Sequence, residues 1–208
     1  MKLYLIRHGQ TDWNVLGKIQ GSYDCCLNDT GITQAKQLSE KIIEANYKFS
    51  KIYSSQQKRA LKTAQILSEA IKVEFVPMHG LEEVKFGEWE GLTWKEIQEQ
   101  FPIEYDEWFN NRRYTRPPKG ESYEDMLQRV LAAIHKIVNM EVSDTAVVTH
   151  GAVIMCILCC ITNTPFAEMM KFKADNTTII EIDSEKFNFK KNNSFKGEEN
   201  GIRYNKGL

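Results

Sequence analysis

Short apolar runs and longer amphipathic segments alternate along this chain. The short runs have the length and the aliphatic character of buried strands. They lie at Lys2–Ile6, Lys51–Ser54, Val73–Val76, Thr145–Thr149 and Thr177–Ile182. Between them, apolar positions recur every three or four residues, which is the spacing of one buried helix face. These stripes begin at Ile32, Ala60 and Met126. Thr30 stands just before one of them and is a predicted helix N-cap, and another helix is predicted to begin at Ser122.

Strands that alternate with helices predict an α/β fold, with a mostly parallel sheet between two helical layers in a three-layer α/β/α arrangement. We expect one domain over residues 1–190. Residues 82–120 are irregular and rich in aromatic side chains, which indicates a lid or an insert, whereas the polar residues 191–208 are typical of a mobile tail. In such sheets ligands bind outside the carboxyl ends of the strands.

Composition narrows the class of partner. The 208 residues carry 27 basic and 28 acidic side chains, so a net charge of −1 attracts neither nucleic acid nor an anionic membrane. No apolar stretch approaches the roughly 18 residues of a membrane span. Five cysteines, an odd number, fit a disulfide framework poorly and favour a reducing compartment. We therefore expect a cytoplasmic protein that binds neither nucleic acid nor membranes.

Two histidines follow predicted strands. His8 comes directly after the first strand, beside Arg7, and His150 comes directly after the fourth. Arg59 lies in the first turn of the helix that follows the second strand. Neutral imidazole is a competent nucleophile, and the guanidinium fork matches phosphate oxygens. The set predicts phosphoryl transfer without a metal ion, since arginines beside the histidines would repel a cation. We expect no cofactor.

Four blocks of sequence resemble, in order, the signatures of the histidine phosphatase superfamily, which includes the cofactor-dependent phosphoglycerate mutases. They are Arg-His-Gly-Gln-Thr-Asp-Trp-Asn at 7–14, Ser-Ser, Arg-Ala and Thr-Ala within 54–64, Leu-Glu-Glu, Phe-Gly and Trp-Glu-Gly within 81–91, and Val-Thr-His-Gly at 148–151. The resemblance runs from residue 1 to about residue 183. A three-residue match alone would be weak, but four ordered blocks at strand ends are specific.

The resemblance implies a phosphoglycerate mutase-like fold and a role for each matching residue. His8 would be the nucleophile that becomes phosphorylated. The residues implied in catalysis are His8, Glu83, His150, Arg7 and Arg59. The residues implied in binding the substrate phosphate are Arg7, His8, Asn14, Arg59, His150 and Gly151.

Two adjacent carboxylates compete for the role of general acid. Glu83 occupies the position at which the family's third block carries its carboxylate, whereas Glu82 stands where relatives often carry arginine. We favour Glu83. The acid must be protonated when substrate is bound, and a phosphate dianion nearby would raise its pKa.

Three functions are compatible with these residues. The first is a phosphomonoesterase acting on a small phosphorylated metabolite, the second a mutase-type isomerase, and the third a non-catalytic module that binds phosphorylated ligands. The third block, from Phe86 to Thr93, resembles the phosphatase branch, which includes α-ribazole phosphatases and broad-specificity enzymes. We favour hydrolysis, with α-ribazole 5′-phosphate as one candidate substrate.

Three further residues are predicted to set specificity. Arg112 and Arg113 are similar to a pair of arginines with which mutases hold a substrate carboxylate, and Gln20 follows the first block. A basic pair of this kind predicts a substrate with a second negative group. The expected partners are this metabolite and, as an open alternative, a second copy of the chain.

Overall fold

The computed structural model describes residues 1–187 and the backbone of residues 202–205. Its strands are β1 (Lys2–Arg7), β2 (Lys51–Ser54), β3 (Phe75–Pro77), β4 (Thr145–Thr149), β5 (Ile179–Asp183) and β6 (Ile202–Asn205). Its α-helices are α1 (Asp12–Val15), α2 (Asp29–Glu44), α3 (Lys58–Ile71), α4 (Trp94–Gln100), α5 (Pro102–Asn110), α6 (Tyr123–Met140) and α7 (Gly151–Thr162). Short 3₁₀ helices lie at Gly87–Trp89, Phe166–Phe172 and Ser184–Phe187.

One sheet runs through the molecule in the order β3-β2-β4-β1-β5-β6. The four strands from β3 to β1 are parallel, and β5 and β6 continue the sheet antiparallel. The predicted α/β architecture with a mostly parallel sheet is therefore confirmed. β6 was not predicted, because it lies within the polar segment 191–208 for which we expected a mobile tail. The rest of that segment lies outside the described residues.

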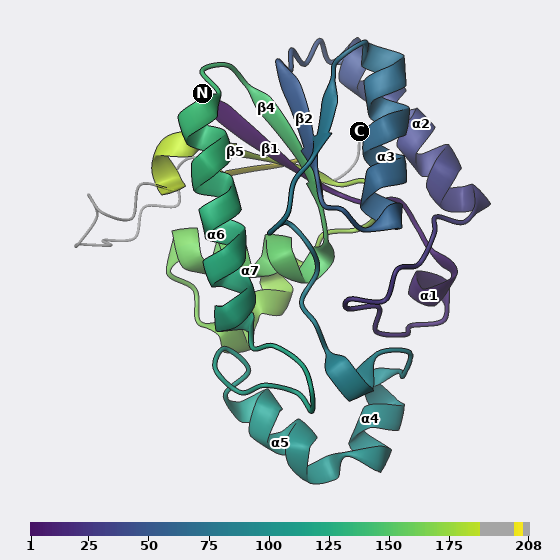
Figure 1. The fold of residues 1–208 in the computed structure, drawn as a ribbon, viewed down its shortest axis with the longest axis vertical. Coiled ribbons are helices and arrows are strands. Elements are labelled where there is room, and N and C mark those ends of the chain that lie inside the picture. The colour runs from purple at the N-terminus through teal and green to yellow at the C-terminus, as the bar shows by residue number, and fades with distance from the viewer. Residues whose placement is uncertain (188–201, 206–208) are drawn as a thin grey trace.

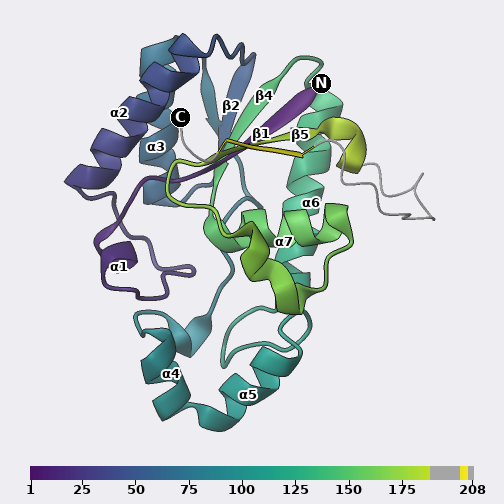
Figure 2. The same ribbon diagram turned by 180° about the vertical axis from the view of Figure 1, so that it is seen from behind.

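Helices cover both faces of the sheet (Figures 1 and 2). Side chains alternate along each strand, so Leu3 and Leu5 of β1 join one core cluster and Tyr4 and Ile6 join the other. The first cluster is completed by α6 and α7, and the second by α2 and α3. α7 is so apolar that most of its residues are buried, which matches a helix between the sheet and its neighbours. This placement fixes the start of α7 at the sheet edge.

Helices α4 and α5 lie at one end of the molecule, away from the sheet (Figures 1 and 2). Thr93 and Glu96 form a capping box at the start of α4, and Pro102 occupies the first turn of α5. Trp108 of α5 packs against Phe86 and Trp89, with ring centroids 6.1 and 5.5 Å apart. The aromatic residues of 82–120 thus join these helices to the rest of the molecule.

Two helix starts test the predictions. The helix that was expected to begin at Ser122 is α6, and Ser122 is its N-cap in a capping box with Asp125. Thr30 does not cap α2, because the helix begins earlier and Asn28 accepts a hydrogen bond from the Gly31 amide. In the described part of the chain, no single helix is long and apolar enough to cross a membrane. Only α7 together with Phe166–Phe172, a pair bent by 113°, passes on length and composition.

Candidate active site

The carboxyl ends of two neighbouring strands bring the two histidines together. β1 and β4 pair in parallel with Arg7 opposite Thr149, so the next residue of each strand is a histidine at the same edge. The rings of His8 and His150 lie 5.2 Å apart between centroids. Both side chains are buried, at 2% and 0% exposure. The sequence prediction that these residues share one sheet edge is therefore confirmed.

His8 is held in one tautomer by its own neighbour. Its Nδ1 lies 2.7 Å from the Gly9 carbonyl oxygen. Because a carbonyl can only accept, Nδ1 carries the proton and Nε2 keeps its lone pair. Burial lowers the pKa of His8 well below its usual value, and the charges of Arg59 and Arg7 lower it further. The imidazole is thus neutral and presents an unprotonated nitrogen, as a nucleophile requires.

Two guanidinium groups flank this imidazole, of which Arg59 is fully buried and Arg7 is half-buried. Arg59 lies in the first turn of α3 and donates to the Tyr23 and Gly21 carbonyls at 2.8 and 2.9 Å. Arg7 ends β1 and donates to the Ala174 carbonyl at 2.7 Å. The Nε atoms of both arginines are buried and have no hydrogen-bond partner in the described part of the chain. Burial lowers the pKa of both groups, while the charge of Glu83 opposes that shift. The site therefore holds a surplus of buried positive charge that an anion would balance.

His150 stands at the N-cap position of α7. Its Nε2 lies 2.8 Å from the Ser55 hydroxyl, and its Nδ1 has no partner among the described residues. Burial lowers the pKa of His150 well below its usual value, and Arg59 contributes next. His150 itself does not line the cavity that His8 and Arg59 line, although the next residue, Gly151, does.

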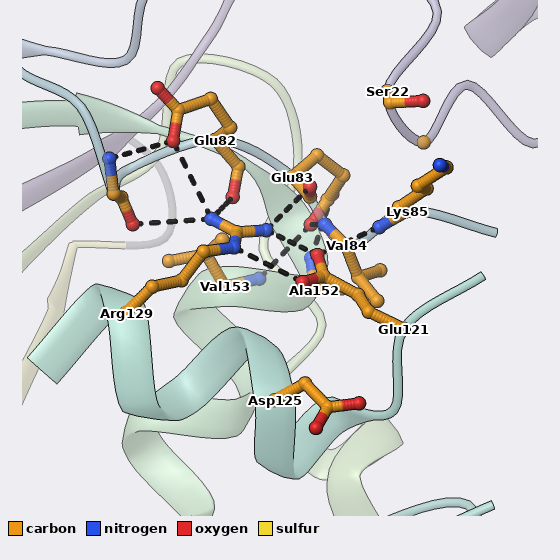
Figure 3. A network of polar contacts seen from close by, with 12 residues as sticks. Ser22, Glu82, Glu83, Val84, Lys85, Glu121, Asp125, Arg129, Ala152 and Val153 are labelled. Carbon is orange, nitrogen blue, oxygen red and sulfur yellow. Dashed lines mark hydrogen bonds and ion pairs between the residues drawn. The ribbon is translucent and has the colours of Figure 1, made fainter. Parts of the chain in front are cut away.

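The two carboxylates that competed for one role lie in different environments. The Glu83 carboxylate accepts hydrogen bonds from the amides of Val84, Ala152 and Val153 at 3.1 to 3.3 Å, and it lines the same cavity as His8. Glu82 turns back to the Gly80 amide at 2.7 Å and does not line that cavity. Figure 3 shows the two side chains diverging. The geometry favours Glu83 as the acid that faces a substrate.

Two amide side chains complete the wall. The Asn14 Oδ1 atom accepts from the Thr11 amide at 3.1 Å and from Asn176 at 3.3 Å, which leaves the Asn14 NH₂ group to donate elsewhere. Gln20 is 8% exposed, and its Oε1 has no partner within the described residues. Both line the cavity, as does Gly151, which lies against Arg7.

The cavity in front of these groups has a volume of about 430 Å³. Arg7, His8, Arg59 and Glu83 line it, together with six aromatic residues, which are Phe86, Trp94, Tyr105, Trp108, Phe109 and Tyr123. Such a space admits a small ester whose charged end points inward. Among the described residues, no group of three or more His, Cys, Asp or Glu side chains could hold a metal ion.

Comparisons with known proteins agree with this geometry. Residues 3–194 match the model of the histidine phosphatase superfamily (branch 1). The chain belongs to this superfamily, and it is an enzyme of the histidine phosphatase type. It is 33% identical over 180 residues to rat 6-phosphofructo-2-kinase/fructose-2,6-bisphosphatase 3, a match covering 86% of this chain and 31% of that protein. The chain thus corresponds to about a third of that curated relative.

Two solved structures share the fold of this histidine phosphatase over nearly the same length. Entamoeba histolytica phosphoserine phosphatase in complex with 3-phosphoglyceric acid has a TM-score of 0.76 and 32% identity, covering 88% of this chain and 90% of that one. Shigella flexneri α-ribazole phosphatase has a TM-score of 0.77 and 27% identity, with the same coverage of both chains. Phosphatases are therefore among its structural neighbours.

The structure separates the two arginines that were predicted to act as a pair. Arg112 lines the cavity of this histidine phosphatase, is 9% exposed, and has an Nε atom without a hydrogen-bond partner in the described ranges. Arg113 does not line the cavity and instead donates to Glu124 at 2.8 Å. The prediction that Arg113 contacts substrate is not supported by this placement, since its charge is already paired.

Several positioning groups escaped the sequence analysis. Asn176 donates to the His8 carbonyl at 2.9 Å, Thr63 accepts from the Gly9 amide at 3.0 Å, and Gln57 accepts from the Glu83 amide at 2.9 Å. Thr63 belongs to the second block of the family resemblance, but the sequence analysis predicted no role for it. Asn176 and Gln57 carry no signal in sequence, because their roles depend on which loops meet.

Proposed function

We propose that the chain is a metal-independent phosphomonoesterase that hydrolyses a small phosphorylated metabolite through a phosphohistidine on His8. The observation that carries the proposal is His8, whose Nδ1 is bound to the Gly9 carbonyl so that Nε2 is unprotonated, in a cavity that Arg7, Arg59 and Glu83 also line. A nucleophile, cationic donors and an acid are the components that phosphoryl transfer needs.

In the first step, the lone pair of His8 Nε2 attacks phosphorus and the bond from phosphorus to the ester oxygen breaks. Arg7, Arg59 and His150 stabilise the equatorial oxygens, with the Asn14 amide and the Gly151 backbone as further donors. Glu83 gives its proton to the departing alkoxide. The products are an alcohol and phospho-His8.

In the second step, the Glu83 carboxylate takes a proton from water, and the resulting hydroxide equivalent attacks phosphorus. The bond from phosphorus to Nε2 breaks, its electron pair returns to His8, and inorganic phosphate leaves. Glu83 is then protonated again and ready for the next substrate. A mutase would instead return the phosphoryl group to a second hydroxyl of the bound product.

The non-phosphate part of the substrate is proposed to carry a second negative group. Arg112 supports this, because a buried guanidinium with a free N–H in the cavity wall is suited to a carboxylate or phosphate. Its guanidinium carbon lies 5.1 and 4.6 Å from the Trp108 and Phe109 rings, which fix its orientation. Phosphoserine, 3-phosphoglycerate and α-ribazole 5′-phosphate are the test substrates that the relatives suggest.

The decisive experiment is hydrolysis of 4-nitrophenyl phosphate in excess chelator. We expect turnover by the wild type, an acid-labile phosphoprotein in a rapid quench, and loss of both in His8→Ala. His79→Ala, which alters an exposed histidine, is the matched control and keeps activity. Near-normal turnover by His8→Ala would refute the mechanism, and loss of activity on chelation would refute its metal independence. With the test substrates, release of free phosphate rather than an isomer distinguishes hydrolase from mutase.

A further inference from the structure

Arg129 of α6 reaches beneath the loop that carries Glu83 (Figure 3). It donates to the carbonyls of Gly80, Glu82 and Glu83 at 3.2, 2.7 and 2.9 Å. Its remaining donors, Nε and a second Nη2 hydrogen, bind both carboxylate oxygens of Glu121. A guanidinium has five N–H groups, so all of them are used, and three serve the backbone of one short loop.

The backbone of Glu83 is thereby held from both sides. Its amide donates to Gln57 Oε1 at 2.9 Å, and its carbonyl accepts from Arg129. The side chain extends from this fixed peptide to the start of α7, where the amides of Ala152 and Val153 bind its carboxylate. Because the Glu83 side chain is attached to the backbone that Arg129 holds, Arg129 influences where the carboxyl group lies.

Glu121 joins the same assembly to the far side of the loop. Its carboxylate accepts from the Lys85 amide at 2.9 Å, and its own amide donates to the Lys85 carbonyl at 2.8 Å. The side chains of Arg129 and Glu121 are only 23% and 20% exposed. The charge of Arg129 is paired with Glu121 and lies 3.6 Å from the Glu82 carboxylate. Its planar guanidinium holds the three carbonyls and the Glu121 carboxylate in one fixed geometry, which an ammonium group could not do. The geometry therefore indicates that the exact placement of this loop matters.

We propose that Arg129 is a positioning residue for the acid step, setting where the Glu83 carboxyl group meets the leaving oxygen. The inference rests on the proposed function. Arg129 does not line the substrate cavity, so it acts through the loop rather than on the substrate. Misplacement of a reacting group by about 1 Å can reduce rate on the order of 100-fold.

The test compares two substrates with different leaving groups. 4-Nitrophenolate departs as a stable anion, whereas the alkoxide of an alkyl phosphate such as phosphoserine needs a proton. Because Glu83 also acts in the second step, the readout is kcat/KM, which reports only the steps up to departure of the leaving group. In Arg129→Met we expect kcat/KM for the alkyl ester to fall about 10- to 100-fold, since a general acid contributes roughly 100- to 10,000-fold. We expect kcat/KM for 4-nitrophenyl phosphate to fall by less than about 3-fold, because its leaving group needs no proton.

Three comparisons separate positioning from general support of the fold. Arg129→Lys keeps the positive charge but loses the planar guanidinium. It should therefore show the same difference between the two esters, with a smaller loss of rate. Arg116→Met removes an exposed ion pair to Asp125 at the start of the same helix and should leave both rates unchanged. In a Glu83→Gln background, Arg129→Met should lower the alkyl ester rate little further, because the acid it positions is already absent.

Two results would overturn the inference: an equal loss of kcat/KM on both esters, or a full additional loss in the Glu83→Gln background. Should Arg129→Met fail to fold, the substrate pattern of Arg129→Lys decides alone. Failure of the wild type to hydrolyse either ester would instead overturn the proposed function, and this inference with it.

Discussion

The arginines and the Gly9 carbonyl have opposite effects on the protonation of His8. The arginines are suited to an incoming phosphate, yet their charge also disfavours protonation of the imidazole between them. The Gly9 carbonyl acts the other way, because it accepts a hydrogen bond from Nδ1 and favours the protonated ring. Burial and the two positive charges outweigh this single acceptor. His8 is therefore already neutral in the free site.

This predicts an unusual titration of His8. An unfolded histidine has a pKa of about 6.5, and burial, Arg59 and Arg7 hold the pKa of folded His8 well below it. Below about pH 6.5 the unfolded chain thus binds a proton that the folded state does not, so this group's contribution to stability is complete above that pH and is lost as the pH falls towards the folded pKa. NMR of ¹⁵N-labelled histidines should show neutral His8 at pH 6, with the urea-unfolded chain as reference. A folded midpoint at or above 6.5 would contradict the prediction.

Arg112 and Arg113 offer a matched pair for testing substrate charge. Loss of a charge-assisted hydrogen bond costs about 1.5–3 kcal/mol, or roughly 10- to 150-fold in binding. We expect Arg112→Met to raise KM by this order for a phosphate ester that also carries a carboxylate, and to affect 4-nitrophenyl phosphate less. Arg113→Met, which breaks an ion pair outside the cavity, should change neither KM appreciably. Equal effects of the two variants would count against a second anion site at Arg112.

At the scale of elements, the His8 loop is set by the helix packed against it. Gly9 and Gly31 face each other so closely that a Cβ on Gly9 would lie 2.5 Å from the Gly31 carbonyl oxygen. A Cβ on Gly31 would lie 2.1 Å from the Gln10 carbonyl oxygen. Because the nearest atoms belong to the backbone, neither the end of β1 nor the start of α2 can move away without a large cost in free energy. The Gly9 carbonyl that orients His8 is thus placed by the start of α2.

Gly31→Ala should therefore destabilise the protein although it replaces a helical glycine. Alanine in a helix is usually more stable by about 0.5–1 kcal/mol, but forced overpacking costs about 1–3 kcal/mol. The clash is expected to prevail, lowering Tm and reducing turnover through the displaced His8 loop. Thr30→Ala, at the exposed neighbouring position of α2, supplies the control and should not lower Tm. An unchanged or higher Tm in Gly31→Ala would show that the loop adapts freely.

Elements with strong periodicity could be predicted from sequence, and contacts between loops could not. The strands and helices that carry His8, Arg59 and His150 follow from apolar spacing, and their meeting follows from the geometry of parallel strands. The start of α2 was misplaced because Thr30 and Asn28 are both competent caps. β6 was missed because its residues lie in a polar segment and pair only once β5 is in place. Arg129 was missed because three of its hydrogen-bond partners are backbone carbonyls, which a sequence pattern does not reveal.

At the scale of the molecule, the site is a junction of segments far apart in the chain. β1, the start of α3, the loop at Glu83 and the start of α7 each deliver one part of it. In the described structure, Glu83 is the nearby carboxylate whose charge opposes the shifts of both Arg7 and Arg59. Uncompensated buried charge weakens a fold. An anion that binds all four segments should thus stabilise the whole molecule and not the site alone.

Inorganic phosphate or vanadate should accordingly raise Tm. A ligand at 100 times its Kd contributes about 2.7 kcal/mol, which corresponds to roughly 5–10 °C for a chain of this size. Sodium chloride at equal ionic strength controls for screening and should produce a much smaller shift, because it lacks the oxygens that the guanidinium groups bind. In Arg59→Met the rise in Tm caused by phosphate should largely vanish, because a buried hydrogen-bond donor to the oxyanion has been removed. If phosphate acts no differently from chloride, or stabilises Arg59→Met as much as the wild type, then these segments do not converge on an oxyanion and the buried arginines serve only the fold.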